Sequence, residues 1–64
     1  MRWVVKLGEK TYLPKRNDTE AHLLMLPVTI TFAATFRTKK SAIAAFKNAS
    51  AYAAYTPIYE KREL

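Results

Sequence analysis

The 64-residue sequence contains no cysteine, a single glycine and one histidine. Without cysteine no disulfide can form, and one histidine cannot build a zinc site of the usual kind. A single glycine also excludes a glycine-rich phosphate-binding loop, which needs several glycines at fixed spacing. We therefore expect a fold that needs no metal, cofactor or disulfide.

Groups that carry out acid–base or nucleophilic chemistry are equally few. His22 follows Asp18 by four residues, but an Asp–His pair at this helical spacing is typical of a surface contact. Neither Ser41 nor Ser50 lies in the sharp strand–helix turn that exposes a nucleophilic serine. The carboxylates are scattered along the chain, at Glu9, Asp18, Glu20, Glu60 and Glu63. The sequence therefore predicts that the protein is not an enzyme.

Long apolar segments are absent too. Arg2 and Lys6 interrupt the start of the chain, whereas a secretory signal needs roughly 7–15 apolar residues in a row. The longest run without charge, residues 23–36, contains Pro27 and is shorter than the ~20 residues of a membrane-spanning helix. The final KREL is similar to an endoplasmic-reticulum retention tail, but without a signal segment we expect a cytoplasmic protein with no membrane partner.

Hydrophobic residues make up 50% of the chain, and they alternate in short segments near its start. Residues 3–13 predict a β-hairpin, because β-branched and aromatic residues flank Gly8 and Glu9. Glycine suits the first loop position of a type II′ turn, and with this turn Val5 faces Tyr12 across the two strands.

The segment that follows allows two interpretations. Asn17 is followed three residues later by Glu20, which resembles a capping pair for a short helix. This helix would end near Met25, because Pro27 disfavours helical angles in the residue before it. A strand over residues 23–26 is the alternative.

The second half of the chain predicts a strand, one long helix and a last strand. Apolar residues alternate with threonines over residues 28–32, which is the period of a half-buried strand. Thr38 is suited to cap a helix over residues 39–54, whose apolar positions follow helical spacing. Pro57 ends this helix, and a strand begins at Ile58.

We therefore predict a single α+β domain over residues 1–64, with a small antiparallel sheet of three or four strands and one long helix packed on one face. The hairpin and the helix should share one core. The residues expected in this core are Trp3, Val5, Tyr12, Ile30, Phe32, Phe36, Ile43 and Phe46.

Positive charge is concentrated on the hairpin and the long helix. Eleven Lys and Arg oppose five Asp and Glu, which gives a net charge of +6. Cations beside the unpaired N–H groups at a helix start can bind phosphate or another anion; the alternative is that these lysines extend into water. The basic residues expected to contact an acidic protein surface or nucleic acid are Lys15, Arg16, Arg37, Lys39, Lys40 and Lys47.

Three tyrosines, Tyr52, Tyr55 and Tyr59, cluster between the helix end and the last strand. Tyrosine buries a large area and is favoured in binding surfaces, where it can also stack on unpaired bases. These residues form either a partner-binding surface or a cover for the alanine-rich end of the helix.

The stretch from Phe36 to Ile43, FRTKKSAI, resembles a pattern common in small bacteriophage accessory and early proteins. There, an aromatic residue, a cation and a capping threonine precede a lysine-rich helix that contains alanine, with strands on both sides. The resemblance implies a β-β-α-β fold and a protein that inhibits or modulates a host complex, such as RNA polymerase or a defence nuclease. Such a protein would act in the cytoplasm of the host cell.

The sequence thus predicts a small basic binding protein without enzymatic activity that docks on a host protein or protein complex. The alternative is direct binding of nucleic acid through the cations of the helix and the hairpin. A third interpretation is a homo-oligomer that pairs through an exposed sheet edge, because small cores often need partners.

Overall fold

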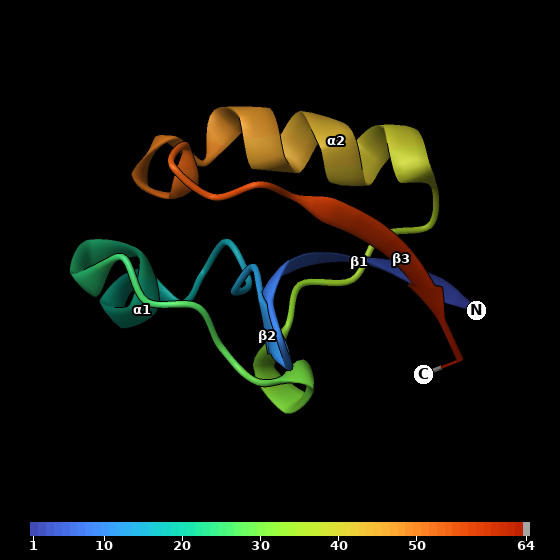
Figure 1. Cartoon of the computed structure of the whole chain (residues 1–64), viewed down its shortest axis with the longest axis horizontal. Helices are drawn as coiled ribbons and strands as arrows, with labels where there is room; N and C mark the ends of the chain where they lie inside the picture. Colours follow the sequence, from blue (N-terminus) through green and yellow to red (C-terminus); the bar gives the residue numbers. More distant parts are fainter. Residues whose placement is uncertain (64) are drawn as a thin grey trace.

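Three antiparallel strands form the sheet of the protein (Figure 1). In the computed structural model, which describes residues 1–63, β1 is Arg2–Gly8, β2 is Thr11–Tyr12 and β3 is Ile58–Arg62, in the order β2-β1-β3. Helix α2, Lys39–Asn48, lies across one face of this sheet, and the shorter α1, Thr19–Leu24, lies to its side. The architecture is α+β, as predicted.

The two ends of the chain pair with each other. β1 and β3 are antiparallel over five residue pairs, from Arg2 opposite Arg62 to Lys6 opposite Ile58. This pairing makes β1 the central strand, and it confirms the predicted last strand.

The hairpin forms, but in a different register from the predicted one. Lys6 faces Tyr12 and Gly8 faces Thr11, with an irregularity in β1 between the two pairs. The positive φ of the loop lies at Lys10 (59°), not at the glycine. A Cβ at Gly8 would lie 2.8 Å from Oγ1 of Thr11. The predicted type II′ turn and its register are wrong, because a close approach rather than a positive φ favours glycine here.

The predicted strand over residues 28–32 is wrong. Val28 makes a single antiparallel bridge to Tyr12, with N–O distances of 2.7 and 2.9 Å. The chain then turns into a 3-10 helix, η1, over Ile30–Phe32. A second antiparallel bridge, Pro14 to Ala33, follows this 3-10 helix, so η1 divides the pairing into two isolated bridges instead of one strand.

Both helices begin at side-chain caps. Asp18, not the predicted Asn17, caps α1 by accepting a hydrogen bond from the N–H of Ala21 (3.2 Å). Thr38 caps α2 as predicted, by accepting from the N–H of Ser41 (3.1 Å). Since α1 is a helix, the alternative of a strand in this segment is wrong.

Helix α2 ends at Asn48, earlier than the predicted residue 54. The chain leaves the helix at Ala49 (φ −94°, ψ 72°) and forms a second 3-10 helix, η2, over Ser50–Tyr52. This turn directs Tyr52 into the interior, where its side chain is fully buried. Within residues 1–63, no helix is long and apolar enough to cross a membrane.

The core occupies both faces of β1, because the fully buried Val4 and Val5 point to opposite sides. The cluster under α2 consists of Val5, Leu7, Leu13, Ala42 and Tyr52, with Trp3, Phe36 and Phe46 packed against it. The other cluster consists of Val4, Tyr12 and Ala33, with Ile30 against it. The shared core of hairpin and helix is confirmed, but Ile43 belongs to neither cluster. Phe32 is 60% exposed, because η1 turns it outward.

Candidate protein-binding surface

Large apolar side chains are exposed around the end of α1. They are Leu23, Leu24, Met25, Leu26 and Phe32, hereafter the apolar patch. Each is more than half exposed, and Leu23 is 81% exposed. Leu24, Leu26 and Phe32 line one open pocket of about 320 Å³, which joins these three patch residues between α1 and η1, and Leu23 and Met25 are their neighbours in the chain. Contiguous apolar surface on a small protein commonly marks an interaction site.

The anchoring of α1 explains why its leucines face solvent. The helix buries only Ala21, whose carbonyl oxygen accepts a hydrogen bond from the hydroxyl of Tyr52 (3.0 Å). The ring of His22 packs edge-on against the ring of Tyr52, with 5.5 Å between the centroids. These contacts hold one side of α1 to the core and leave Leu23 and Leu24 on the outside.

Helix α1 ends in a left-handed residue, and this residue is Met25 rather than glycine. Met25 has φ 55° and ψ 39°, and the N–H of Leu26 donates to the carbonyl oxygen of Ala21 over 3.1 Å. Glycine is the usual left-handed residue in this hydrogen-bond pattern. A residue with a side chain costs roughly 1–2 kcal/mol in the left-handed conformation. Met25 thus exposes a large apolar side chain at a position where it destabilises the fold.

Carboxylates border the apolar patch on one side. Asp18 and Glu20 line the same pocket as Leu24, Leu26 and Phe32. Asp18 is held in place by its cap bond to Ala21, whereas Glu20 is exposed in the first turn of α1. An apolar centre with a polar rim is the usual composition of a protein–protein interface.

The predicted basic residues are exposed, but the fold distributes them over three places. These places are the start of α2 with Arg37, Lys39 and Lys40, the last turn of α2 with Lys47, and the loop before α1 with Lys15 and Arg16. The structure therefore does not bring them together as one site.

Residues from elsewhere in the chain extend the group at the start of α2. Trp3 and Phe36 form an antiparallel bridge, with N–O distances of 2.7 and 2.8 Å, which places the start of α2 beside β1. The Nζ atoms of Lys39 and Lys61 lie 6.0 and 5.9 Å from the centroid of the Trp3 ring. The basic cluster at this end of the molecule, hereafter the basic end, consists of Arg2, Arg37, Lys39 and Lys61.

The three tyrosines differ in exposure. Tyr52 is fully buried, and its hydroxyl lies within hydrogen-bond distance of the carbonyl oxygens of Ala21 and Leu26. It cannot contact a partner in this fold, so the binding role considered for Tyr52 is wrong. Tyr55 and Tyr59 are partly buried against the core, and their contact with a partner stays a prediction.

His22 and Asp18 have separate partners. Nε2 of His22 lies 3.0 Å from the carbonyl oxygen of Lys15. Because a carbonyl oxygen only accepts, this nitrogen carries the hydrogen and donates it. The carboxylate of Asp18 accepts from the backbone of α1 instead. Both side chains therefore organise the loop around α1.

The sequence contained a signal for the apolar patch. Residues 23–26 are four consecutive large apolar residues, and one face of a short helix can bury only part of such a run. The run is too short to predict a membrane-spanning helix. Because one face of a helix cannot bury four consecutive residues, however, the run predicts that some of its leucines are exposed.

Comparison of the chain with protein families, curated proteins and solved structures finds no significant match. The resemblance to phage early proteins therefore stays a prediction.

Proposed function

We propose that the protein is a non-enzymatic binding protein that docks on a partner protein through the apolar patch. The patch itself carries this proposal: four consecutive large apolar residues are solvent-exposed in a domain of 64 residues. Such residues lower the solubility of a small protein unless a partner covers them. The central leucines and Phe32 would provide the buried centre of the interface, and Asp18 and Glu20 part of its polar rim.

Charge favours an acidic partner over a second copy of the chain. Two copies, each with a net charge of +6, repel one another, whereas a negatively charged protein is attracted. Attraction between opposite charges speeds the encounter, and the apolar contacts then set the lifetime of the complex. The partner is therefore an acidic protein whose apolar groove covers the patch and whose neutral or basic groups face Asp18 and Glu20 at the rim.

The conformation of Met25 supports a binding role. A glycine at this position would relieve the left-handed strain, yet the chain has an exposed methionine there. Backbone strain of this kind is often found at functional sites. Methionine is also common at adaptable binding surfaces, because its flexible side chain adjusts to a partner.

The resemblance to phage early proteins extends the proposal. It implies that the partner is a bacterial host protein or complex and that docking inhibits or modulates it. An enzyme that handles nucleic acid, such as RNA polymerase or a defence nuclease, holds the nucleic acid in a basic groove, so a basic inhibitor would dock on an acidic surface elsewhere on the enzyme.

The test is capture of a partner from a nuclease-treated bacterial lysate by the tagged protein, with matched variants. We expect the double variant Leu23→Gln/Phe32→Gln to lose the captured protein while it keeps the wild-type melting temperature, because both residues are exposed. Ile58→Gln is the control, since Ile58 is 58% exposed on β3 and lies outside the patch. Equal capture by all three proteins, or concentration-dependent dimerisation of the purified chain through Leu23, would contradict the proposal.

Nucleic-acid binding is the second candidate, and the basic end favours it. The fold brings Lys39 and Lys61 to the ring of the partly buried Trp3, and Arg2 and Arg37 are the chain neighbours of Trp3 and of its bridge partner Phe36. A cluster of cations beside an aromatic ring is a common element of single-strand binding sites. The dependence of binding on salt separates the two candidates.

A further inference from the structure

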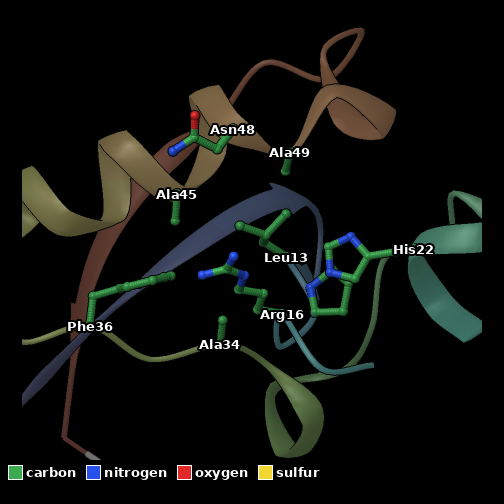
Figure 2. A pocket seen from close by; sticks show the side chains of 9 residues that line it. Leu13, Arg16, His22, Ala34, Phe36, Ala45, Asn48 and Ala49 are labelled. Atoms are coloured by element: carbon green, nitrogen blue, oxygen red, sulfur yellow. The ribbon is translucent and has the colours of Figure 1, made fainter. Parts of the chain in front are cut away.

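A second pocket, separate from the apolar patch, lies between α2 and the loop that precedes α1 (Figure 2). Its volume of about 490 Å³ falls within the range of small-molecule sites, roughly 300–1,000 Å³. Most of its wall is apolar and comes from Leu13, Phe36, Ala45 and Ala49. The alanines of α2 leave the space open, because their side chains are too short to fill it.

One cation, the exposed Arg16, lies at the open side of this apolar space. The side chain of Arg16 projects from the loop toward the region between Phe36 and Ala45 (Figure 2). Within residues 1–63, the one ion pair joins Arg62 to Glu60 and does not involve Arg16. None of the residues that line the pocket is acidic. The guanidinium group thus faces the pocket without a carboxylate of the described chain to neutralise it.

The loop that carries Arg16 is held in place on both sides. The N–H of Asp18 donates to the carbonyl oxygen of Lys15 over 3.0 Å, which closes a turn around Arg16. The same carbonyl oxygen accepts from Nε2 of His22, also over 3.0 Å. Pro14, the residue before this turn, is fully buried. The backbone at Arg16 is therefore ordered before any ligand arrives, which lowers the entropic cost of binding.

We propose that this pocket binds a carboxylate attached to a flat apolar group. A guanidinium fork matches the two oxygens of a carboxylate, and the pair is stronger beside apolar walls than in water. The ring of Phe36 and the alanine wall accommodate a flat apolar body. The carboxamide of Asn48, on the α2 side of the pocket, provides a further hydrogen-bonding group.

This chemistry has two sources, a free aromatic acid and a peptide that ends in an aromatic residue with its C-terminal carboxylate. A phosphate group is a poorer match, because Arg16 and His22 are the only basic side chains among the lining residues and most of the wall is apolar. The proposal is independent of docking through the apolar patch, since none of the patch residues lines this pocket.

The test is a titration of the full chain, labelled with ¹⁵N, with 2-naphthoate and with a tripeptide that ends in phenylalanine. For 2-naphthoate we expect a dissociation constant of about 0.1–1 mM, with amide shifts confined to the neighbourhood of Phe36, Ala45 and Ala49. Arg16→Gln should weaken binding at least tenfold. Lys15→Gln removes the same charge one residue away, outside the pocket, and should change binding less than twofold.

The chemical controls distinguish the sources of the carboxylate. 2-Naphthamide and the amidated tripeptide, which lack the charge, should not bind. Tighter binding of the acidic tripeptide than of 2-naphthoate would identify a protein C-terminus as the ligand, and the reverse would identify a small aromatic acid; both support the proposal. Equal binding of acid and amide, equal loss in the Lys15 and Arg16 variants, or shifts caused by inorganic phosphate alone would overturn it. The Leu23→Gln/Phe32→Gln variant should bind 2-naphthoate as the wild type does, whether or not it captures a partner.

Discussion

The hydroxyl oxygen of Tyr52 lies 2.8 Å from the carbonyl oxygen of Leu26, a contact between residues that are 26 positions apart in the sequence. The same hydroxyl lies 3.0 Å from the carbonyl oxygen of Ala21. One buried side chain, which follows the end of α2, thus holds the short helix that carries the apolar patch. The stability of the fold and the presentation of the patch are therefore coupled through Tyr52.

Removal of this hydroxyl should loosen α1. We expect Tyr52→Phe to lower the free energy of unfolding by about 1–2 kcal/mol, because the single hydroxyl hydrogen, which lies within reach of the carbonyl oxygens of Ala21 and Leu26, is lost. Urea denaturation measures the loss, and hydrogen exchange of the α1 amides should become faster. Tyr55→Phe is the control: its ring lies 5.9 Å from that of Tyr52, but its hydroxyl has no hydrogen-bond partner within residues 1–63. A similar loss in both variants would contradict this role.

The same residue should make the fold sensitive to alkaline pH. Burial, and then the charges of Tyr55 and Asp18, raise the pKa of the Tyr52 hydroxyl above its ordinary value of 10.0. The folded state therefore favours the neutral hydroxyl, and this contribution to stability is complete below the unfolded-state pKa and is lost as the pH rises through the folded-state pKa. Denaturation by urea at several pH values above about 10 should show a steeper loss for the wild type than for Tyr52→Phe. Parallel curves would assign the alkaline loss to other groups.

Met25 and Lys10 both have a left-handed backbone conformation, so glycine variants at the two positions separate the effect of backbone strain on stability from the effect of the Met25 side chain on binding. Met25→Gly should raise the free energy of unfolding by about 0.5–1 kcal/mol, since glycine adopts this conformation without a steric cost. It should also weaken partner capture, because an exposed apolar side chain of the patch is lost. Lys10→Gly relieves a similar φ (59°) in the hairpin loop, far from the patch. It should stabilise the fold and leave capture unchanged; loss of capture in both variants would exclude a specific role for Met25.

Two phenylalanines that the sequence predicts as core residues should now behave differently. Phe46 packs against the cluster under α2, and Phe46→Ala should cost about 2–3 kcal/mol, less than for a fully buried ring. Phe32 is 60% exposed, so Phe32→Ala should change stability by less than about 0.5 kcal/mol. Thermal and urea denaturation of the two variants measure both values. A large loss for Phe32→Ala would place its ring in the core.

Salt dependence tests the nucleic-acid alternative. If the basic end contacts phosphates, log K for single-stranded DNA should fall by about 0.7 per phosphate for each tenfold increase in salt. The double variant Lys39→Gln/Lys61→Gln should then reduce the slope by about two contacts. We expect instead weak binding to bare DNA, and a captured protein complex that survives nuclease and moderate salt. Tight binding to DNA that depends steeply on salt and is lost in the double variant would reverse this preference.

Local signals were sufficient for several features. Thr38 caps α2 where it was predicted, and a strand follows Pro57 as predicted, because capping and proline geometry depend on a few neighbouring residues. The α+β class likewise follows from the alternation of short strand and helix patterns. The candidate site was harder to predict from the sequence. The sequence predicts that the cations are exposed, but the length of the apolar run only excludes a membrane-spanning helix and does not indicate a binding surface.

The sequence by itself determined the net charge of +6, the absence of cysteine, the capped helix and the strands at both ends of the chain. Only the tertiary structure decided which apolar residues became core and which became surface. Tyr52 is buried and Leu23 is exposed, although both lie in apolar segments, because Tyr52 packs in the cluster under α2 and bonds to the carbonyl oxygen of Ala21, whereas α1 buries only Ala21. Such contacts join residues far apart in the sequence, so local periodicity cannot distinguish a ring that faces the core from a leucine that faces solvent.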